Sequence, residues 1–202
     1  MRCVRSLAFL LLLALLSIPL AAQRPRPRST LVEVDDARRG GFWVALDLGA
    51  GAESVNLKGD NLGYSDALTR PVGSIRLGGT VSQHLRLGGE LFAWVNDRNG
   101  AVETLSSAAA IAQLYPFARA GLYIKGGIGL GRSAVEVDGF TNDDYGVSGH
   151  LGLGYEIRVG RRISIVPAAD LVQQVYGGRG GLPGYTERLG VLSLGVAYQA
   201  GR

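Results

Sequence analysis

The sequence has almost no cysteine or methionine. It contains one of each in 202 residues, and the only cysteine is Cys3, close to the N-terminus. The remainder of the chain therefore has no partner for a disulfide and no thiolate to ligate a metal ion. Stability must come from another source, such as a closed hydrogen-bonded sheet.

Net charge and long apolar runs are also scarce. The formal charge is +4, and subtracting Arg2 and Arg5 of the N-terminal segment leaves only +2 for the rest. Such a weak basic excess argues against nucleic acid as a partner. After the N-terminal segment, no apolar stretch reaches the 18 residues that a membrane-spanning helix needs.

The first 22 residues have the three parts of an export signal. Arg2 and Arg5 precede the apolar stretch Ser6–Ile18, and small residues up to Ala22 follow Pro19. This order predicts a signal peptide over residues 1–22, cleaved after Ala22. A lipid-anchored precursor would need its cysteine just after the apolar stretch, whereas Cys3 precedes it.

Residues 23–40 form a polar segment between the signal and the first strand. Proline alternates with arginine in Gln23–Arg28, and proline disfavours helix at its own position and at the one before. We predict a flexible periplasmic linker. The alternative, that these arginines contact anionic lipid or peptidoglycan, stays open.

What the sequence has in abundance is alternation of apolar with polar or small residues. Alternation places successive side chains on opposite faces of a strand, and each stretch is close to the length that a tilted membrane strand requires. Alternation is weakest in the fourth and seventh stretches. In the seventh, Pro167 predicts a bulge or an irregular start. The eight predicted strands are Phe42–Glu53, Val72–Ser82, Leu85–Asn96, Thr104–Tyr115, Gly121–Arg132, Val147–Arg158, Ile163–Tyr176 and Leu189–Gln199.

The connections alternate between long and short. The short ones are 83–84, 116–119 and 159–162, and the long ones are 57–71, 97–103, 134–146 and 177–188. Small outer-membrane barrels have short periplasmic turns and longer external loops. The pattern therefore predicts an all-β, eight-stranded antiparallel up-and-down transmembrane β-barrel over residues 41–202. A soluble lipocalin-like barrel also has eight strands, but it would reverse the polarity of the two faces.

The inward faces of these strands carry charges of both signs. A barrel of eight strands is just wide enough for side chains to fill, and buried charges must be paired. We predict an interior ion-pair network, with Arg76 and Glu90 on adjacent strands as its best pair. An ion pathway lined by the same residues is the alternative. The set is Asp47, Glu53, Arg76, Arg86, Glu90, Lys125, Glu156, Arg158 and Asp170.

Signals for chemistry are few. His150 beside Ser148 and Glu156 suggests a hydrolase, but all three fall on the inward face, whereas a barrel enzyme acting on lipid must present its groups to lipid. Asp143 and Asp144 could bind a divalent cation but are expected to be solvated. We predict no catalytic residue, no metal site and no cofactor.

Together, the signal, the Gly-x-Gly strands (Gly126–Gly131, Gly152–Tyr155) and the aromatic-ended last strand resemble the small eight-stranded outer-membrane barrels, such as the OmpA membrane domain, OmpX and OmpW. The resemblance implies an outer-membrane protein of a Gram-negative bacterium. It also implies an assembly signal read by the barrel-insertion machinery, formed by Leu192, Leu194, Val196 and Tyr198.

The expected function is non-enzymatic, with a structural role or a surface interaction mediated by the loops. A narrow channel for small solutes, similar to OmpW, is the main alternative, and a lipid-modifying barrel enzyme or a lipocalin-like binder is a further one. The expected partners are outer-membrane lipid, lipopolysaccharide and the assembly machinery, and we expect a monomer.

Overall fold

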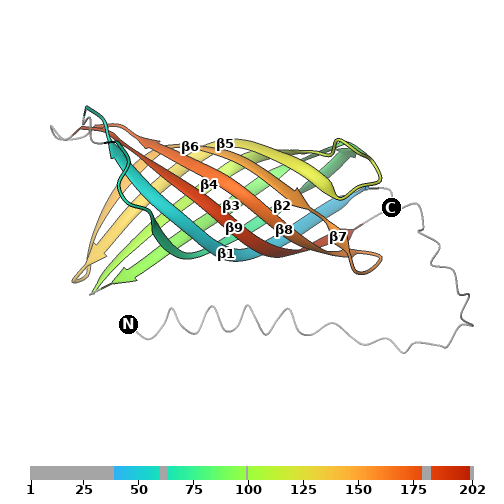
Figure 1. Ribbon diagram of the computed structural model, residues 1–202, viewed down its shortest axis with the longest axis horizontal. Coiled ribbons are helices and arrows are strands. Elements are labelled where there is room, and N and C mark those ends of the chain that lie inside the picture. The colour runs from blue at the N-terminus through green and yellow to red at the C-terminus, as the bar shows by residue number, and fades with distance from the viewer. Residues whose placement is uncertain (1–38, 60–62, 99, 179–182, 201–202) are drawn as a thin grey trace, which may run out of the picture. The chain divides into compact units, whose positions relative to one another are not determined.

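The computed structural model describes residues 39–59, 63–98, 100–178 and 183–200. The predicted signal and most of the predicted linker lie outside these residues. The strands are β1 Phe42–Leu57, β2 Leu68–Ser82, β3 Leu85–Arg98, β4 Ala101–Leu114, β5 Leu122–Val137, β6 Phe140–Tyr155, β7 Ile157–Arg158, β8 Ile163–Tyr176 and β9 Tyr185–Ala200. The two-residue β7 continues β6 beyond Glu156, so eight strands form the wall (Figure 1).

Each strand pairs antiparallel with its neighbours in sequence order. The sheet closes because β1 pairs with β9, with Leu46 opposite Val196, and β6 pairs with β8, with Leu151 opposite Leu171. The predicted eight-stranded up-and-down barrel is therefore confirmed. Figure 1 shows the strands tilted against the long axis, as closure of a barrel requires. The residues that the structure describes include no helix long and apolar enough to cross a membrane.

The two faces of the wall differ sharply in polarity. Large apolar side chains point outward and are highly exposed, for example Leu48 at 75%, Leu130 at 72% and Leu192 at 70%. Trp43 and Trp94 point inward and are at most 1% exposed. An apolar exterior is the arrangement of a membrane barrel and the reverse of a soluble lipocalin-like one.

The external connections differ from the prediction. The predicted loop 134–146 is wrong, because β5 and β6 continue through it and meet at a two-residue turn of Asp138 (φ 50°) and Gly139 (φ 83°). Two positive φ values suit a hairpin turn of the type that follows the twist of the strands. The predicted loop 97–103 likewise shortens, since β3 runs to Arg98 and β4 begins at Ala101.

The two strands with weak alternation are regular in their pairing. β4 pairs with β3 and β5 without a register shift, and its outward residues are small, which explains the weak pattern. Opposite Pro167 the ladder between β6 and β8 is interrupted but resumes in the same register at Ile157. The register shift in β2 lies elsewhere, between Thr80 and Ser82.

Candidate functional site in the barrel lumen

The lumen is filled by side chains in layers. One apolar cluster contains Trp43, Ala45, Ala109, Ile111, Tyr115, Tyr123, Val166 and Ala197, and it lies toward the periplasmic end of the strands. The other contains Val72, Phe92, Trp94, Leu105, Val172, Leu189 and Val191 and lies toward the external end. On β8 the inward Asp170 falls between Val166 of the first cluster and Val172 of the second, so a charged layer separates them.

Arg76 and Asp47 form the first ion pair of this middle layer. Arg76 Nη2 lies 2.6 Å from Asp47 Oδ1 and Nε lies 2.9 Å from Oδ2, which is a bidentate contact. Arg76 Nη1 also donates to the Tyr123 hydroxyl at 2.9 Å. Fixed geometry on both carboxylate oxygens makes this a strong charge-assisted pair.

Lys125 is the cation of a second group. Its ammonium lies 2.7 Å from Glu90 Oε1 and 2.9 Å from Asp170 Oδ1, and it is 1% exposed. One side chain from β5 therefore binds carboxylates on β3 and β8. The formal charge of this group of one lysine and two carboxylates is −1.

The predicted pair of Arg76 with Glu90 is wrong. The two residues are register partners on β2 and β3, but Arg76 binds Asp47 on β1 and Glu90 binds Lys125 on β5. Asp47 lies on β1, the other neighbour of β2, whereas Lys125 on β5 and Glu90 on β3 are separated by β4. Long side chains can cross the narrow lumen, so a partner need not lie on a neighbouring strand.

His150 lies at the centre of a polar cluster. Its Nε2 is 2.8 Å from Ser148 Oγ and 3.1 Å from Ser107 Oγ, and its Nδ1 is 3.2 Å from Glu90 Oε2. The order serine, histidine and carboxylate is that of a hydrolytic triad. However, the His150 side chain is 0% exposed and lies in the lumen, with its ring edge against Phe92, and therefore does not face lipid.

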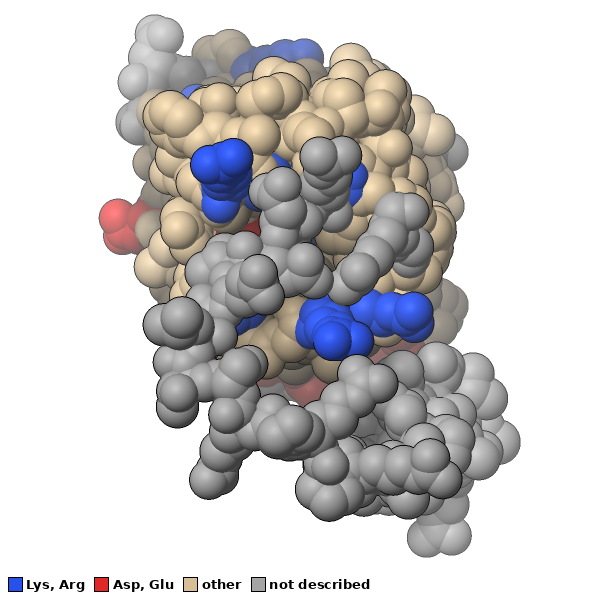
Figure 2. Space-filling model, turned by 90° about the vertical axis from the view of Figure 1, so that its right-hand side faces the viewer, with Lys and Arg blue, Asp and Glu red and all other residues tan. Residues whose placement is uncertain are grey.

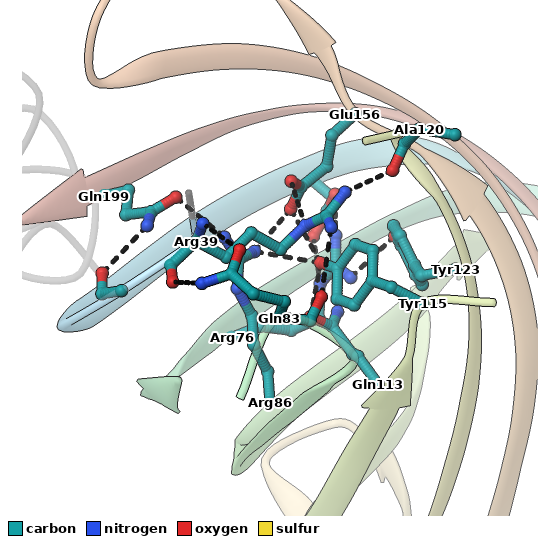
Figure 3. A network of polar contacts seen from close by, with 12 residues as sticks. Arg39, Arg76, Gln83, Arg86, Gln113, Tyr115, Ala120, Tyr123, Glu156 and Gln199 are labelled. Carbon is teal, nitrogen blue, oxygen red and sulfur yellow. Dashed lines mark hydrogen bonds and ion pairs between the residues drawn. The ribbon is translucent and has the colours of Figure 1, made fainter. Parts of the chain in front are cut away.

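A third network closes the periplasmic end (Figure 3). Arg86 Nη1 forms an ion pair with Glu156 Oε1, and the same carboxylate oxygen accepts a hydrogen bond from Tyr115 at 2.8 Å. Arg86 Nη2 donates to Gln199 Oε1 at 2.9 Å, and the Gln199 amide donates to the Gly40 carbonyl at 2.8 Å. These contacts connect β3, β9 and the segment that leads into β1.

Arg39 completes this network and was missed by the sequence analysis, which assigned it to the linker. It is only 4% exposed, and its guanidinium donates to the carbonyls of Gln83, Ala118 and Ala120, with Nη1 lying 2.9 Å from the Ala118 oxygen. It also stacks on the Tyr115 ring, 3.8 Å from the centroid. Residues 39–40 are thus part of the barrel and not of a free linker.

Two predicted members lie apart from the contacts described above. Arg158 lies in β7, beyond the break at Glu156, and is exposed at the periplasmic rim. Glu53 is 5% exposed, but it lies toward the external end and makes no ion pair with a described residue. Figure 2 looks onto the periplasmic end and shows several separate patches of Lys and Arg side chains there; the exposed arginines at this end are Arg119, Arg158, Arg161 and Arg162.

The candidate cation pair, Asp143 and Asp144, contacts other side chains of the barrel. Among residues 39–59, 63–98, 100–178 and 183–200 no three His, Cys, Asp or Glu side chains are placed to hold an ion. Asp143 forms an ion pair with Arg132, whose Nη2 lies 2.7 Å from the Asp143 Oδ1. Asp144 accepts a hydrogen bond from the Tyr185 hydroxyl at 2.9 Å.

Two cavities in the part of the lumen that the structure describes are small. One cavity, lined by Asp47, Glu90, Lys125 and Asp170, has a volume of about 10 Å³, and a second at the periplasmic mouth, beside Arg86, also has about 10 Å³. Each has room for about one water molecule. These volumes are far below what a hydrated solute would require.

With this geometry established, comparison with known proteins gives the family. The profile of the outer membrane protein beta-barrel domain matches residues 8–198. The chain belongs to the outer membrane protein beta-barrel domain family. Its members and structural neighbours are outer-membrane proteins of Gram-negative bacteria. No curated protein matches the sequence.

Solved structures agree on the fold. Neisserial surface protein A is 18% identical with a TM-score of 0.58, and the match covers 79% of this chain and 97% of that one. Ail, the attachment invasion locus protein of Yersinia pestis, in complex with the heparin analogue sucrose octasulfate, is 11% identical with a TM-score of 0.50, covering 78% and 99%. At these identities the likeness establishes the barrel fold and nothing about ligands.

Proposed function

We propose that this chain is a non-enzymatic outer-membrane barrel with a closed lumen, whose role is structural or is exerted by its external hairpins. The observation that carries the proposal is the layered filling of the lumen. Trp43 and Trp94, at 1% and 0% exposure, lie in separate apolar clusters with the ion pairs of Arg76 and Lys125 between them. An ion crossing the barrel would have to pass both apolar layers without water.

The enzyme alternative is less well supported. Ser148 and His150 have hydrolytic geometry, but Ser148 is 0% exposed, the His150 side chain is 0% exposed, and both point into the lumen. Both residues line a depression in the wall between β5, β6 and β8, but their side chains are buried in the lumen, so a lipid at the wall does not reach the Ser148 hydroxyl. We therefore assign these residues to lumen packing.

The external hairpin of β5 and β6 is the most prominent candidate interaction surface. Phe140 beside its turn is 83% exposed and Tyr145 on its flank is 69% exposed. The same hairpin carries Glu136, Asp138, Asp143 and Asp144, against Arg132 alone. This acidic balance favours neutral or cationic partners, so the sulfated ligand seen with Ail is not expected to bind here.

Outward residues of β9 fit the predicted assembly signal. Leu192, Leu194, Val196 and Tyr198 all point to the lipid face, with exposures from 70% down to 38%. A last strand that presents such a face suits recognition by the insertion machinery, and it suits contact with outer-membrane lipid once the barrel is inserted.

Conductance in planar lipid bilayers tests the closed lumen. Purified barrel should give no stepwise current above that of protein-free bilayers. The shift in gel mobility between unboiled and boiled samples should show, for the same preparation, that folded barrel was inserted. Reproducible unitary steps from the folded protein would overturn the proposal and favour the narrow channel.

A further inference from the structure

The lipid-facing wall has a depression between β5, β6 and β8. Its volume is about 370 Å³, and Gly149 lies in it, flanked by Ile128, Val147 and Leu171. A Cβ built on Gly149 would meet no atom within 4 Å, so the depression exists because this outward position has no side chain. Its lining is mostly apolar, as an acyl chain requires.

The outward polar side chain that borders this depression is Gln173; Ser148 and His150 also line it, but their side chains point into the lumen. Ile128, Gly149 and Gln173 are register partners across β5, β6 and β8, and all three face outward. The Gln173 amide is half-buried and makes no hydrogen bond with any residue that the structure describes. A half-buried amide on the lipid-facing wall has hydrogen-bonding capacity that a polar group of a bound lipid can satisfy.

The position of Gln173 along the strand sets its depth. It lies ten residues beyond Ile163, the start of β8, and Arg188 likewise lies ten residues from Tyr198 near the end of β9. Ten residues of a strand tilted by about 40° span about 25 Å along the barrel axis, which is the height of the apolar band. Gln173 and Arg188 therefore lie at the boundary between the outer-leaflet chains and their headgroups.

Arg188 provides positive charge at this boundary. It is the register partner of Gln173 on β9, is exposed, and stacks over the Tyr64 ring at 4.4 Å from the centroid. It makes no ion pair within the described part of the chain. Arg132, at the corresponding height on β5, is instead paired with Asp143.

We propose that this depression binds one outer-leaflet lipid with a phosphate-bearing, anionic headgroup. Its acyl chain occupies the space over Gly149, the polar groups at the chain's root hydrogen-bond the Gln173 amide, and the phosphate pairs with Arg188. A guanidinium matches phosphate in geometry as well as in charge. This inference rests on the outer-membrane location and not on the closed lumen, so failure of one leaves the other standing.

Native mass spectrometry of the folded barrel provides the test. The protein is incubated in detergent with equal amounts of dimyristoyl phosphatidylglycerol and dimyristoyl phosphatidylcholine, which differ only in the headgroup. The wild type should retain one phosphatidylglycerol in preference to phosphatidylcholine. Gly149→Leu should lower retention of both lipids about tenfold, a loss of about 1.4 kcal/mol of binding free energy. Arg188→Gln should abolish the preference between headgroups and leave total retention largely unchanged.

Gly89→Leu is the matched control. Gly89 is an outward glycine on β3 whose Cβ would have no neighbour closer than 3.8 Å, but it lies on another part of the wall. This variant should retain lipid as the wild type does. Gln173→Leu supplies a second test that does not depend on the folding of Gly149→Leu. Three results would each overturn the proposal. They are lipid retention at the wild-type level in folded Gly149→Leu or Gln173→Leu, a loss of retention in Gly89→Leu equal to that in Gly149→Leu, and no headgroup preference in the wild type.

Discussion

Lys125 Nζ on β5 lies 2.7 Å from Glu90 Oε1 on β3 and 2.9 Å from Asp170 Oδ1 on β8, so a single buried cation connects three strands across the lumen. Removing it would leave two carboxylates unpaired in the interior, and breaking such a pair costs about 3–5 kcal/mol. Lys125→Met should therefore lower the free energy of unfolding by about that amount.

Urea unfolding in lipid vesicles, followed by the fluorescence of the two lumen tryptophans Trp43 and Trp94, measures this loss. The double variant Lys125→Met with Glu90→Gln should recover part of it, because one unpaired charge is then removed. A loss for Lys125→Met no larger than that of a surface substitution would contradict the proposed pairing.

Arg39 should act as a latch at the periplasmic mouth. Arg39→Ala removes the bonds to the carbonyls of two turns and the contact with the Tyr115 ring. We expect a loss of about 2–4 kcal/mol, since several hydrogen bonds from a charged donor are broken in a buried setting. The midpoint temperature of the gel mobility shift should fall.

Arg119→Ala is the matched control for this latch, because Arg119 is an exposed arginine at the same end of the barrel. Its midpoint should equal that of the wild type. Equal midpoints for Arg39→Ala and the wild type would show that the contacts of Arg39 do not stabilise the barrel.

Glycines on the inward face make room for large side chains. A Cβ on Gly154 would overlap the Tyr123 ring, which is 1% exposed and held by the Arg76 guanidinium. Gly154→Ala should destabilise the barrel by about 1–3 kcal/mol through overpacking. Gly149→Ala, on the outward face of the same strand, should have little effect. The two variants are compared by the folded fraction after refolding, read from unboiled gels. If Gly154→Ala refolds as well as Gly149→Ala, this explanation of the glycine content is refuted.

The wall of the barrel was predictable because its pattern is local. Alternation along Phe42–Glu53 assigns Trp43 and Asp47 to one face and Val44 and Leu46 to the other without knowledge of any partner. The ion pairs were not predictable in the same way, because Lys125 reaches Glu90 across the lumen and not along the ladder. Spacing in the sequence does not reveal such contacts.

Two further errors have physical causes. Arg39 was assigned to the linker because it follows a polar, proline-containing segment. The chain bends at Gly41, whose φ is 71°, between Arg39 and the start of β1. The β5–β6 hairpin was predicted as a loop because its residues beyond the apolar band of the wall are mostly polar. The Asp138–Gly139 pair, a strong hairpin-turn signal, could have identified it.

The most direct test of the sealed lumen is thiol accessibility at Ser148. Ser148 points into the lumen and is 0% exposed, and a chain starting at Gln23 has no cysteine of its own. In folded barrel in vesicles, Ser148→Cys should not react with a charged, water-soluble maleimide, but it should react once the barrel is unfolded in urea. Thr141→Cys, on the exposed external hairpin, should react in both states. Rapid labelling of Ser148→Cys in the folded barrel would show a continuous aqueous path and contradict the closed lumen.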